Sequence, residues 1–145
     1  MTRRLYVETS ALLRVLLDGD AALRPVLSGE GLFTSSLTFL EAGRSIARAR
    51  RERRLDAASA RDAERQLAAF ERGCDVLAME GEVIRRAREE FPEEPVRSLD
   101  AIHLASLLVL DEALGELAVA STDERVRRNA LALGFDVVPP ATAAP

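Results

Sequence analysis

The chain has 145 residues, enough for one domain with a substantial core, and its 48% apolar and 30% charged residues are typical of a soluble globular protein. The net charge of −4 gives no global attraction for nucleic acid, and all 20 basic residues are arginine. The single cysteine, Cys74, excludes an internal disulfide and fits a reducing cytoplasm. Glu8 and Arg14 interrupt the N-terminal apolar run, which argues against a signal peptide. The uncharged run between Asp100 and Asp111 is too short to span a membrane.

Short apolar runs alternate with helical segments along the chain. The runs predict strands, and their near-continuous apolar character is typical of a parallel sheet covered on both faces. The predicted strands are 5–7, 32–36, 75–79, 117–121 and 136–138. The predicted helices are about 10–17, 20–28, 37–54, 56–72, 81–91, 98–113 and 123–133. This alternation predicts an α/β fold with a mostly parallel sheet. The apolar helices 56–72 and 98–113 are candidates for the interface of a homodimer, although packing in the core would give the same pattern.

Four acidic residues fall at strand ends or on the helices that follow. They are Glu8, Glu41, Asp100 and Asp123. Ligands of open α/β sheets gather beyond the carboxyl ends of the strands, so we expect these side chains to meet in one cleft. Four neighbouring carboxylates repel one another, and a divalent cation removes that repulsion. Hard oxygen ligands favour Mg²⁺ or Mn²⁺, and these ions typically serve phosphoryl chemistry.

Three of these acids also have a purely structural interpretation. Glu41 fits a capping box with Thr38, and Ser121 with Glu124 fits a second box that leaves Asp123 as an ordinary first-turn acid. Asp100 follows a possible cap at Ser98 and could complement the helix dipole. Glu8 is different, because a strand end facing a helix start has little structural need for glutamate. The joint placement of all four favours a site.

Four segments, "LYVETSALLRVLL", "SSLTFLEAGRSIARA", "SLDAIHLASLL" and "ASTDERVRRNALALGFDVV", resemble the successive signature blocks of PIN-domain ribonucleases. The resemblance is strongest to the VapC-like toxins of toxin–antitoxin modules and runs in order from Leu5 to Val138. It implies a five-stranded sheet in the order 3-2-1-4-5. It also implies a Mg²⁺- or Mn²⁺-dependent RNA endonuclease that is inhibited by a cognate VapB-like antitoxin. We therefore expect a PIN-like nuclease domain over residues 1–138 and a flexible C-terminal tail over 139–145.

The catalytic acids of the family correspond by resemblance to Glu8, Glu41, Asp100 and Asp123. We expect Glu8, Asp100 and Asp123 to hold the metal ion and Glu41 to ligate through water or to orient the nucleophile. Ser10 and Thr122 match positions where the family often has a hydroxyl near the site, in a supporting role. The family usually has aspartate at the first position. Glu8 is longer by about 1.5 Å, so it could change metal preference or slow the enzyme.

Arginine residues near the acids are the candidates for RNA contacts. Residues 44–54 contain six arginines and one glutamate. Arg48 lies seven residues after Glu41, on the same helical face, and is the first candidate for a phosphate contact, followed by Arg14 and Arg44. A solvated arginine face would look the same. The same two interpretations apply to a second small cluster, Arg125, Arg127 and Arg128. His103 lies one helical turn after Asp100, and its apolar neighbours favour a packing or supporting role over catalysis.

Other classes of protein fit the sequence less well. Receiver domains and haloacid-dehalogenase-like phosphatases rely on a lysine, which the chain lacks, and P-loop nucleotide binding fails for want of a "GK" motif. The main alternative is a catalytically impaired PIN fold that acts as a binding or regulatory protein, motivated by Glu8. Binding of Mn²⁺ and EDTA-sensitive cleavage of RNA would separate the two functions.

Overall fold

The computed structural model describes residues 3–141, and it contains a sheet of five parallel strands between two groups of helices. The strands are β1 (Arg4–Val7), β2 (Leu32–Ser35), β3 (Asp75–Leu77), β4 (Leu117–Ala120) and β5 (Val137–Val138). Their order, β3-β2-β1-β4-β5, and their parallel pairing confirm the predicted α/β fold and the implied strand order. β1 lies at the centre, where Tyr6 pairs with Phe33 of β2 and with Val119 of β4.

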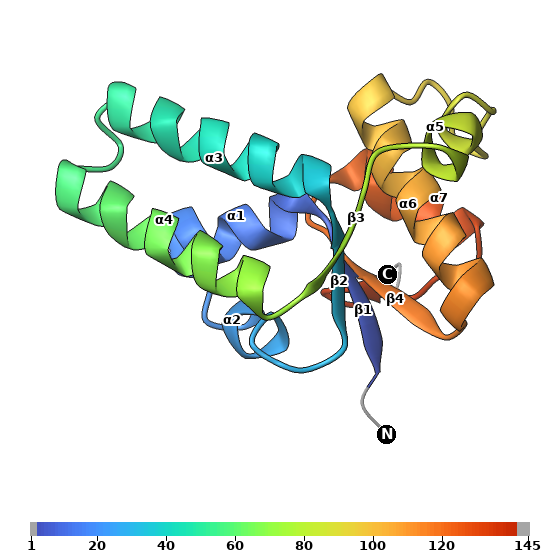
Figure 1. Cartoon of the computed structure of the whole chain (residues 1–145), viewed down its shortest axis with the longest axis horizontal. Helices are drawn as coiled ribbons and strands as arrows, with labels where there is room; N and C mark the ends of the chain where they lie inside the picture. Colours follow the sequence, from blue (N-terminus) through green and yellow to red (C-terminus); the bar gives the residue numbers. More distant parts are fainter. Residues whose placement is uncertain (1–2, 142–145) are drawn as a thin grey trace.

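Seven helices lie among residues 3–141, as predicted. They are α1 (Thr9–Asp18), α2 (Leu23–Val26), α3 (Ser36–Arg51), α4 (Ala57–Arg72), α5 (Glu82–Ala87), α6 (Ser98–Leu114) and α7 (Glu124–Ala132). Figure 1 shows α1 to α4 on one side of the sheet and α5 to α7 on the other. Within the described residues, no helix has both the length and the apolar character needed to cross a membrane. Residues 142–145 of the predicted tail lie outside the described residues.

Alternation along the strands divides the core between the two faces of the sheet. Leu5 and Val7 of β1 pack toward α1, α3 and α4, together with Leu12 of α1 and Ile46 of α3. Tyr6 points to the other face, where it joins the cluster that contains Leu107 of α6. The central strands β1, β2 and β4 are therefore covered on both faces, which explains why their sequences are continuously apolar.

Two of the predicted helices are shorter in the structure. The predicted helix 20–28 is reduced to the four residues of α2, and the predicted helix 81–91 ends at Ala87. After α5 the chain forms a loop in which the carboxylate of Glu94 accepts hydrogen bonds from the backbone N–H groups of Phe91 and Val96, at 2.8 and 2.6 Å. This local side-chain bonding competes with helix and was not evident from the apolar pattern.

The two helices considered for a homodimer interface bury apolar residues within the chain itself. In α4, Ala60, Ala63 and Phe70 are buried against the cluster shared with α1 and α3. In α6, Leu104 and Leu107 are buried on the opposite side of the sheet. Core packing therefore accounts for the apolar pattern of both helices, and the homodimer stays a prediction.

Candidate functional site

Acidic side chains from three helices line one pocket beyond the carboxyl ends of the central strands. Glu41 comes from α3, Asp100 from the first turn of α6, and Asp123 from the residue that begins α7. Glu8, which directly follows β1, is buried and does not line this pocket. Three of the four acids thus share one pocket, as the strand-end argument predicts, and the fourth lies next to the sheet.

The pKa of Asp100 reports on the proximity of the acids. Burial raises this pKa above its ordinary value, and the charges of Asp123, Glu8 and, more weakly, Glu41 raise it further, while His103 partly opposes the shift. Mutual repulsion of this kind is what a cation would relieve.

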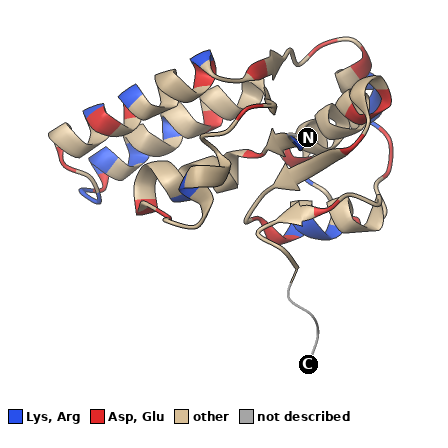
Figure 2. Cartoon of the chain, turned by 90° about the horizontal axis from the view of Figure 1, so that it is seen from below, with Lys and Arg blue, Asp and Glu red and all other residues tan. Residues whose placement is uncertain are grey.

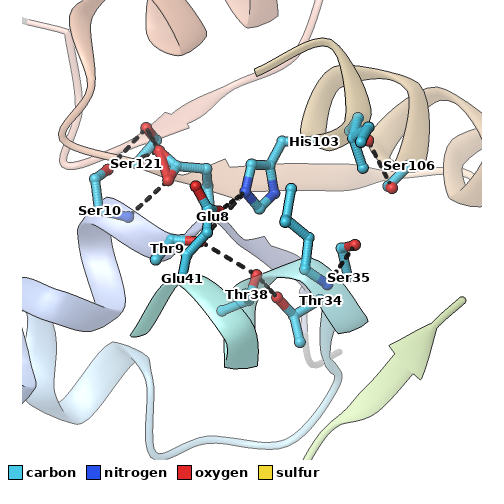
Figure 3. Close-up of polar contacts among 12 residues, drawn as sticks. Glu8, Thr9, Ser10, Thr34, Ser35, Thr38, Glu41, His103, Ser106 and Ser121 are labelled. Carbon is cyan, nitrogen blue, oxygen red and sulfur yellow. Dashed lines mark hydrogen bonds and ion pairs between the residues drawn. The ribbon is translucent and has the colours of Figure 1, made fainter. Parts of the chain in front are cut away.

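Glu8 is held by two serines. Its side chain is only 5% exposed and folds back as the N-cap of α1, accepting a hydrogen bond of 2.6 Å from the backbone N–H of Ser10. The hydroxyls of Ser10 and Ser121 donate to its other oxygen at 2.7 Å each. Figure 3 shows both serines beside the Glu8 carboxylate. Both oxygens are therefore engaged within the protein.

Ser10 and Ser121 also connect Glu8 to the segment that carries Asp123. The Ser10 hydroxyl oxygen accepts hydrogen bonds from the backbone N–H groups of Thr122 and Asp123, at 2.8 and 3.1 Å, and the Ser121 hydroxyl oxygen accepts from the N–H of Asp123 at 3.1 Å. Thr122, the hydroxyl residue proposed from the sequence, takes part here through its backbone. Ser121 is the residue whose hydroxyl reaches Glu8, and its position at the end of β4 was the available signal.

A buried chain of hydrogen bonds fixes Glu41. Its Oε1 atom lies 2.7 Å from Nε2 of His103 and accepts a 2.7 Å hydrogen bond from the hydroxyl of Thr9, contacts drawn in Figure 3. The other ring nitrogen of His103, Nδ1, lies 2.8 Å from the hydroxyl of Tyr6. Burial, followed by the charge of Glu8, raises the pKa of Tyr6, so this hydroxyl keeps its proton. It can therefore donate to Nδ1, which leaves Nε2 as the N–H that donates to Glu41.

These contacts keep Glu41 ionised. Burial alone would raise the pKa of the half-buried carboxyl, but the hydrogen bonds from His103 and Thr9 outweigh that effect and lower the pKa below its ordinary value. Glu41 is therefore a fixed anion at the pocket. Neither Tyr6 nor Thr9 was proposed as a site residue from the sequence. Tyr6 lies in an apolar strand and resembles a packing residue, and Thr9 at the start of a helix resembles a capping residue.

The capping arrangements proposed for the acids are wrong, although Asp123 and Asp100 do lie at the start of a helix. Ser35 is the N-cap of α3, its hydroxyl oxygen accepting from the N–H of Leu37 at 3.1 Å, so the capping box of Thr38 with Glu41 is wrong. The N-cap of α7 is Asp123 itself, which accepts from the N–H of Val126 at 3.1 Å, so the box built on Ser121 is also wrong. Residue 98 lies inside the first turn of α6 and does not cap it.

The arginines proposed for RNA binding lie away from the acidic pocket. Arg14, Arg44 and Arg48 are exposed, and none lines the pocket. Arg48 forms an ion pair with Glu52 at 2.8 Å on the outer face of α3. Figure 2 shows basic residues spread along the paired helices α3 and α4. The contribution of these three arginines to RNA binding stays a prediction.

Cys74 does not provide a nucleophile. Burial raises the pKa of its thiol to about 11, and the charges of Asp75 and Glu71 raise it as well. A thiol of this pKa is protonated at neutral pH and is a poor nucleophile. Its side chain packs against the core on the α4 side of the sheet, consistent with a small apolar residue.

Carboxylate oxygens suit Mg²⁺ or Mn²⁺ chemically, but the arrangement is open. Among residues 3–141, no three His, Cys, Asp or Glu side chains are gathered closely enough to hold a metal ion. Mg²⁺ keeps several waters and often needs only one or two carboxylates together with phosphates of the substrate. Asp100 and Asp123, which share the pocket, meet that requirement. Glu8 does not in this conformation, because its oxygens are occupied by serines.

Comparison with known proteins identifies the family. A sequence profile of the PIN domain matches residues 5–132, so the chain belongs to the PIN domain family. No curated protein matches the chain. The fold is similar to that of a toxin–antitoxin complex from Klebsiella pneumoniae, with a TM-score of 0.62 and 16% identity over 97% of this chain and 99% of that one.

Two further solved structures share the fold. One is VapBC2 from Rickettsia felis bound to a DNA fragment from its promoter, with a TM-score of 0.63 and 7% identity over 86% of this chain and 92% of that one. The other is DNA-bound VapBC from Salmonella typhimurium, with a TM-score of 0.61 and 14% identity over 94% of this chain and 97% of that one. At these identities the likeness concerns the fold.

Proposed function

We propose that this PIN-domain protein is a Mg²⁺- or Mn²⁺-dependent endoribonuclease and the toxin of a VapBC-type pair, acting in the cytoplasm. The observation that carries the proposal is the pocket in which Glu41, Asp100 and Asp123 meet beyond the central strands. The fold shared with toxin–antitoxin complexes supports the assignment to a toxin. A VapB-like antitoxin is the proposed partner, and an arginine of such a partner would pair favourably with the acidic pocket.

Asp100 and Asp123 are the residues that would hold the metal ion. Bound there, the ion would supply activation of water and neutralisation of charge on the phosphate. The raised pKa of Asp100 supports this assignment, since it reflects burial together with unrelieved repulsion from neighbouring acids. Glu8 would have an indirect role. It accepts hydrogen bonds from Ser10 and Ser121, and these two serines fix the backbone N–H of Asp123.

Glu41 is proposed to orient the attacking water. Its pKa lies below the ordinary value despite burial, so it is ionised and can accept a hydrogen bond from water at neutral pH. The N–H of His103 and the hydroxyl of Thr9 fix one of its oxygens. His103 therefore acts through Glu41, as a positioning residue.

The test is incubation of the purified protein with RNA in the presence of Mn²⁺, of Mg²⁺ and of EDTA, followed by mapping of new RNA ends. We expect cleavage with either metal and none with EDTA. Asp100→Asn should reduce cleavage by at least about 100-fold, because misplaced or missing groups cost that much in rate, while the circular dichroism spectrum stays unchanged. Cleavage by Asp100→Asn at the rate of the wild type would contradict the proposal.

A second candidate function is a PIN fold that binds RNA or protein without cleaving. The observation that favours it is the engagement of both Glu8 oxygens by Ser10 and Ser121. Glu8→Asp separates the two functions. An impaired enzyme should gain cleavage when the shorter acid is restored, and a binding protein that lacks other elements of catalysis should gain none.

A further inference from the structure

Two arginines line the acidic pocket in addition to the acids. Arg97 directly precedes α6, and Arg125 is the second residue of α7. Arg125 belongs to the second arginine cluster noted in the sequence, whereas Arg97 was outside the set of arginines considered there. Their presence changes the character of the pocket, because its lining combines two guanidinium groups with four carboxylates, those of Glu41, Asp100, Asp123 and Glu124.

Neither guanidinium is engaged within the part of the chain that the structure describes. Several other arginines form ion pairs there, namely Arg3, Arg48, Arg54, Arg65, Arg85 and Arg86. Within residues 3–141, the side chains of Arg97 and Arg125 form no ion pair and no hydrogen bond with another residue. Within these residues neither arginine forms an ion pair with Asp100 or with another acid of the pocket.

One buried side chain ties together the two segments that carry these arginines. The side chain of Asn129, fully buried on α7, accepts a 2.9 Å hydrogen bond from the N–H of Glu93 and donates to the carbonyl of Glu93 at 3.2 Å. It also donates to the carbonyl of Arg125 at 3.0 Å. The carboxylate of Glu94 holds the remainder of the loop through the N–H of Val96. At the start of α6, the N–H of Ala101 donates to the carbonyl of Arg97 at 2.8 Å. The backbone at both arginines is therefore fixed.

We infer that Arg97 and Arg125 form the phosphate-binding subsite for single-stranded RNA beside the acidic pocket. This inference rests on the proposed function. Carboxylates alone would repel a polyanion, whereas guanidinium groups bind phosphate through paired, charge-assisted hydrogen bonds. Unpaired guanidinium groups on a fixed backbone can bind phosphate without first breaking an ion pair. The subsite would hold the phosphates that flank the cleaved bond.

The test measures binding separately from cleavage. In the Asp100→Asn background, fluorescence anisotropy with a labelled single-stranded RNA gives the Kd over a range of salt concentrations. We expect Arg97→Gln and Arg125→Gln each to weaken binding about 10-fold, a loss within the range for one charge-assisted contact. Each should also lower the slope of log K against log salt by about 0.7, the value for one phosphate contact on a single strand. Replacement by lysine should preserve most of the slope.

Arg65→Gln is the matched control, because Arg65 is exposed on α4, paired with Asp62 and outside the pocket. It should leave Kd and slope within about twofold of the parent. Equal binding by the parent and the Arg97→Gln/Arg125→Gln double variant would overturn the inference, as would a greater loss with Arg65→Gln or no RNA binding by the parent. If the wild type cleaves RNA but the Kd is unchanged by the Arg97 and Arg125 substitutions, only the subsite is refuted. Arginine-dependent binding without cleavage by the wild type supports the subsite and refutes the nuclease.

Discussion

Glu8 shows how one methylene group changes the use of a carboxylate. An aspartate at this position would end about 1.5 Å closer to the backbone. The glutamate reaches the hydroxyl of Ser121 on the neighbouring strand as well as Ser10 on its own helix. A buried carboxylate must have its hydrogen bonds satisfied, and the two serines meet that requirement. The longer side chain thus links the start of α1 to the end of β4.

Removal of the Ser121 hydroxyl should therefore destabilise the protein. We expect Ser121→Ala to lower the free energy of unfolding by about 1–3 kcal/mol, the usual cost of depriving a buried charged acceptor of a donor. Thr122→Ala is the control, since Thr122 contributes its backbone N–H to this network, and it should change stability by no more than about 0.5 kcal/mol. Urea denaturation measures both. Equal stability of the two variants would contradict this role of Ser121.

In the absence of metal, we expect Asp100 to lower the free energy of unfolding by an amount that depends on pH. Its pKa in the folded protein lies above the ordinary value, chiefly through burial and then through Asp123 and Glu8. The folded state therefore binds the proton more tightly, and stability is lost as the pH rises from the unfolded pKa through the folded pKa. Asp100→Asn should accordingly raise the melting temperature at pH 7 in EDTA. This gain should shrink below the unfolded pKa of Asp100, near pH 4.

A melting temperature series for the wild type and Asp100→Asn, recorded in EDTA from acidic to neutral pH, measures that difference. The same series with Mn²⁺ should reverse the order at pH 7, since the wild type gains a ligand that the variant binds less well. A lower melting temperature for the variant in EDTA at pH 7 would show that Asp100 stabilises the fold instead.

His103 determines the ionisation of Glu41. His103→Phe removes the Nε2–H donor and leaves burial, which raises the pKa of Glu41, opposed mainly by Thr9. The Glu41 pKa should therefore increase, and the acid limb of any pH–rate profile should move to higher pH. A carboxyl-carbon NMR titration measures the pKa directly. A Glu41 pKa that is the same in both proteins would contradict the assignment of His103 as a positioning residue.

At the scale of elements, the loop between α5 and α6 depends on α7. Asn129→Ala removes both side-chain hydrogen bonds to Glu93 and the one to the carbonyl of Arg125. We expect a loss of about 1–3 kcal/mol in unfolding free energy, because buried backbone groups lose their partners. Hydrogen exchange at the Glu93 amide should also accelerate. Arg128→Ala, an exposed change on the same helix, should do neither.

The elements that the sequence predicts well are those decided by burial. The continuous apolar runs mark the central strands β1, β2 and β4 because these are covered by helices on both faces of the sheet, whereas the edge strand β3 is largely exposed. The elements predicted poorly are those decided by local side-chain bonding. Glu94 organises the loop that shortens α5, and Ser35 begins α3 earlier than the predicted cap at Thr38. These choices depend on single hydrogen bonds, which apolar periodicity does not record.

At the scale of the whole molecule, topology explains what was predictable about the site. The acids lie far apart in sequence, yet parallel strands bring the carboxyl ends of β1, β2 and β4 to one edge of the sheet. The strand-end pattern was therefore sufficient to propose that Glu41, Asp100 and Asp123 meet. It was not sufficient to find Tyr6 or Ser121, whose roles depend on which face and which neighbour each side chain meets. Nor could it show which of the exposed arginines line the pocket, as Arg97 does.

The most direct test of the central claim is a calorimetric titration of the metal-free protein with Mn²⁺. The account predicts binding by the wild type and affinity reduced by at least about 10-fold in Asp100→Asn and in Asp123→Asn, since each removes a charged ligand. Asp62→Asn, which removes an exposed acid of α4, should bind as the wild type does. Absence of Mn²⁺ binding by the wild type, or equal affinity in all four proteins, would contradict a metal-dependent site in the acidic pocket.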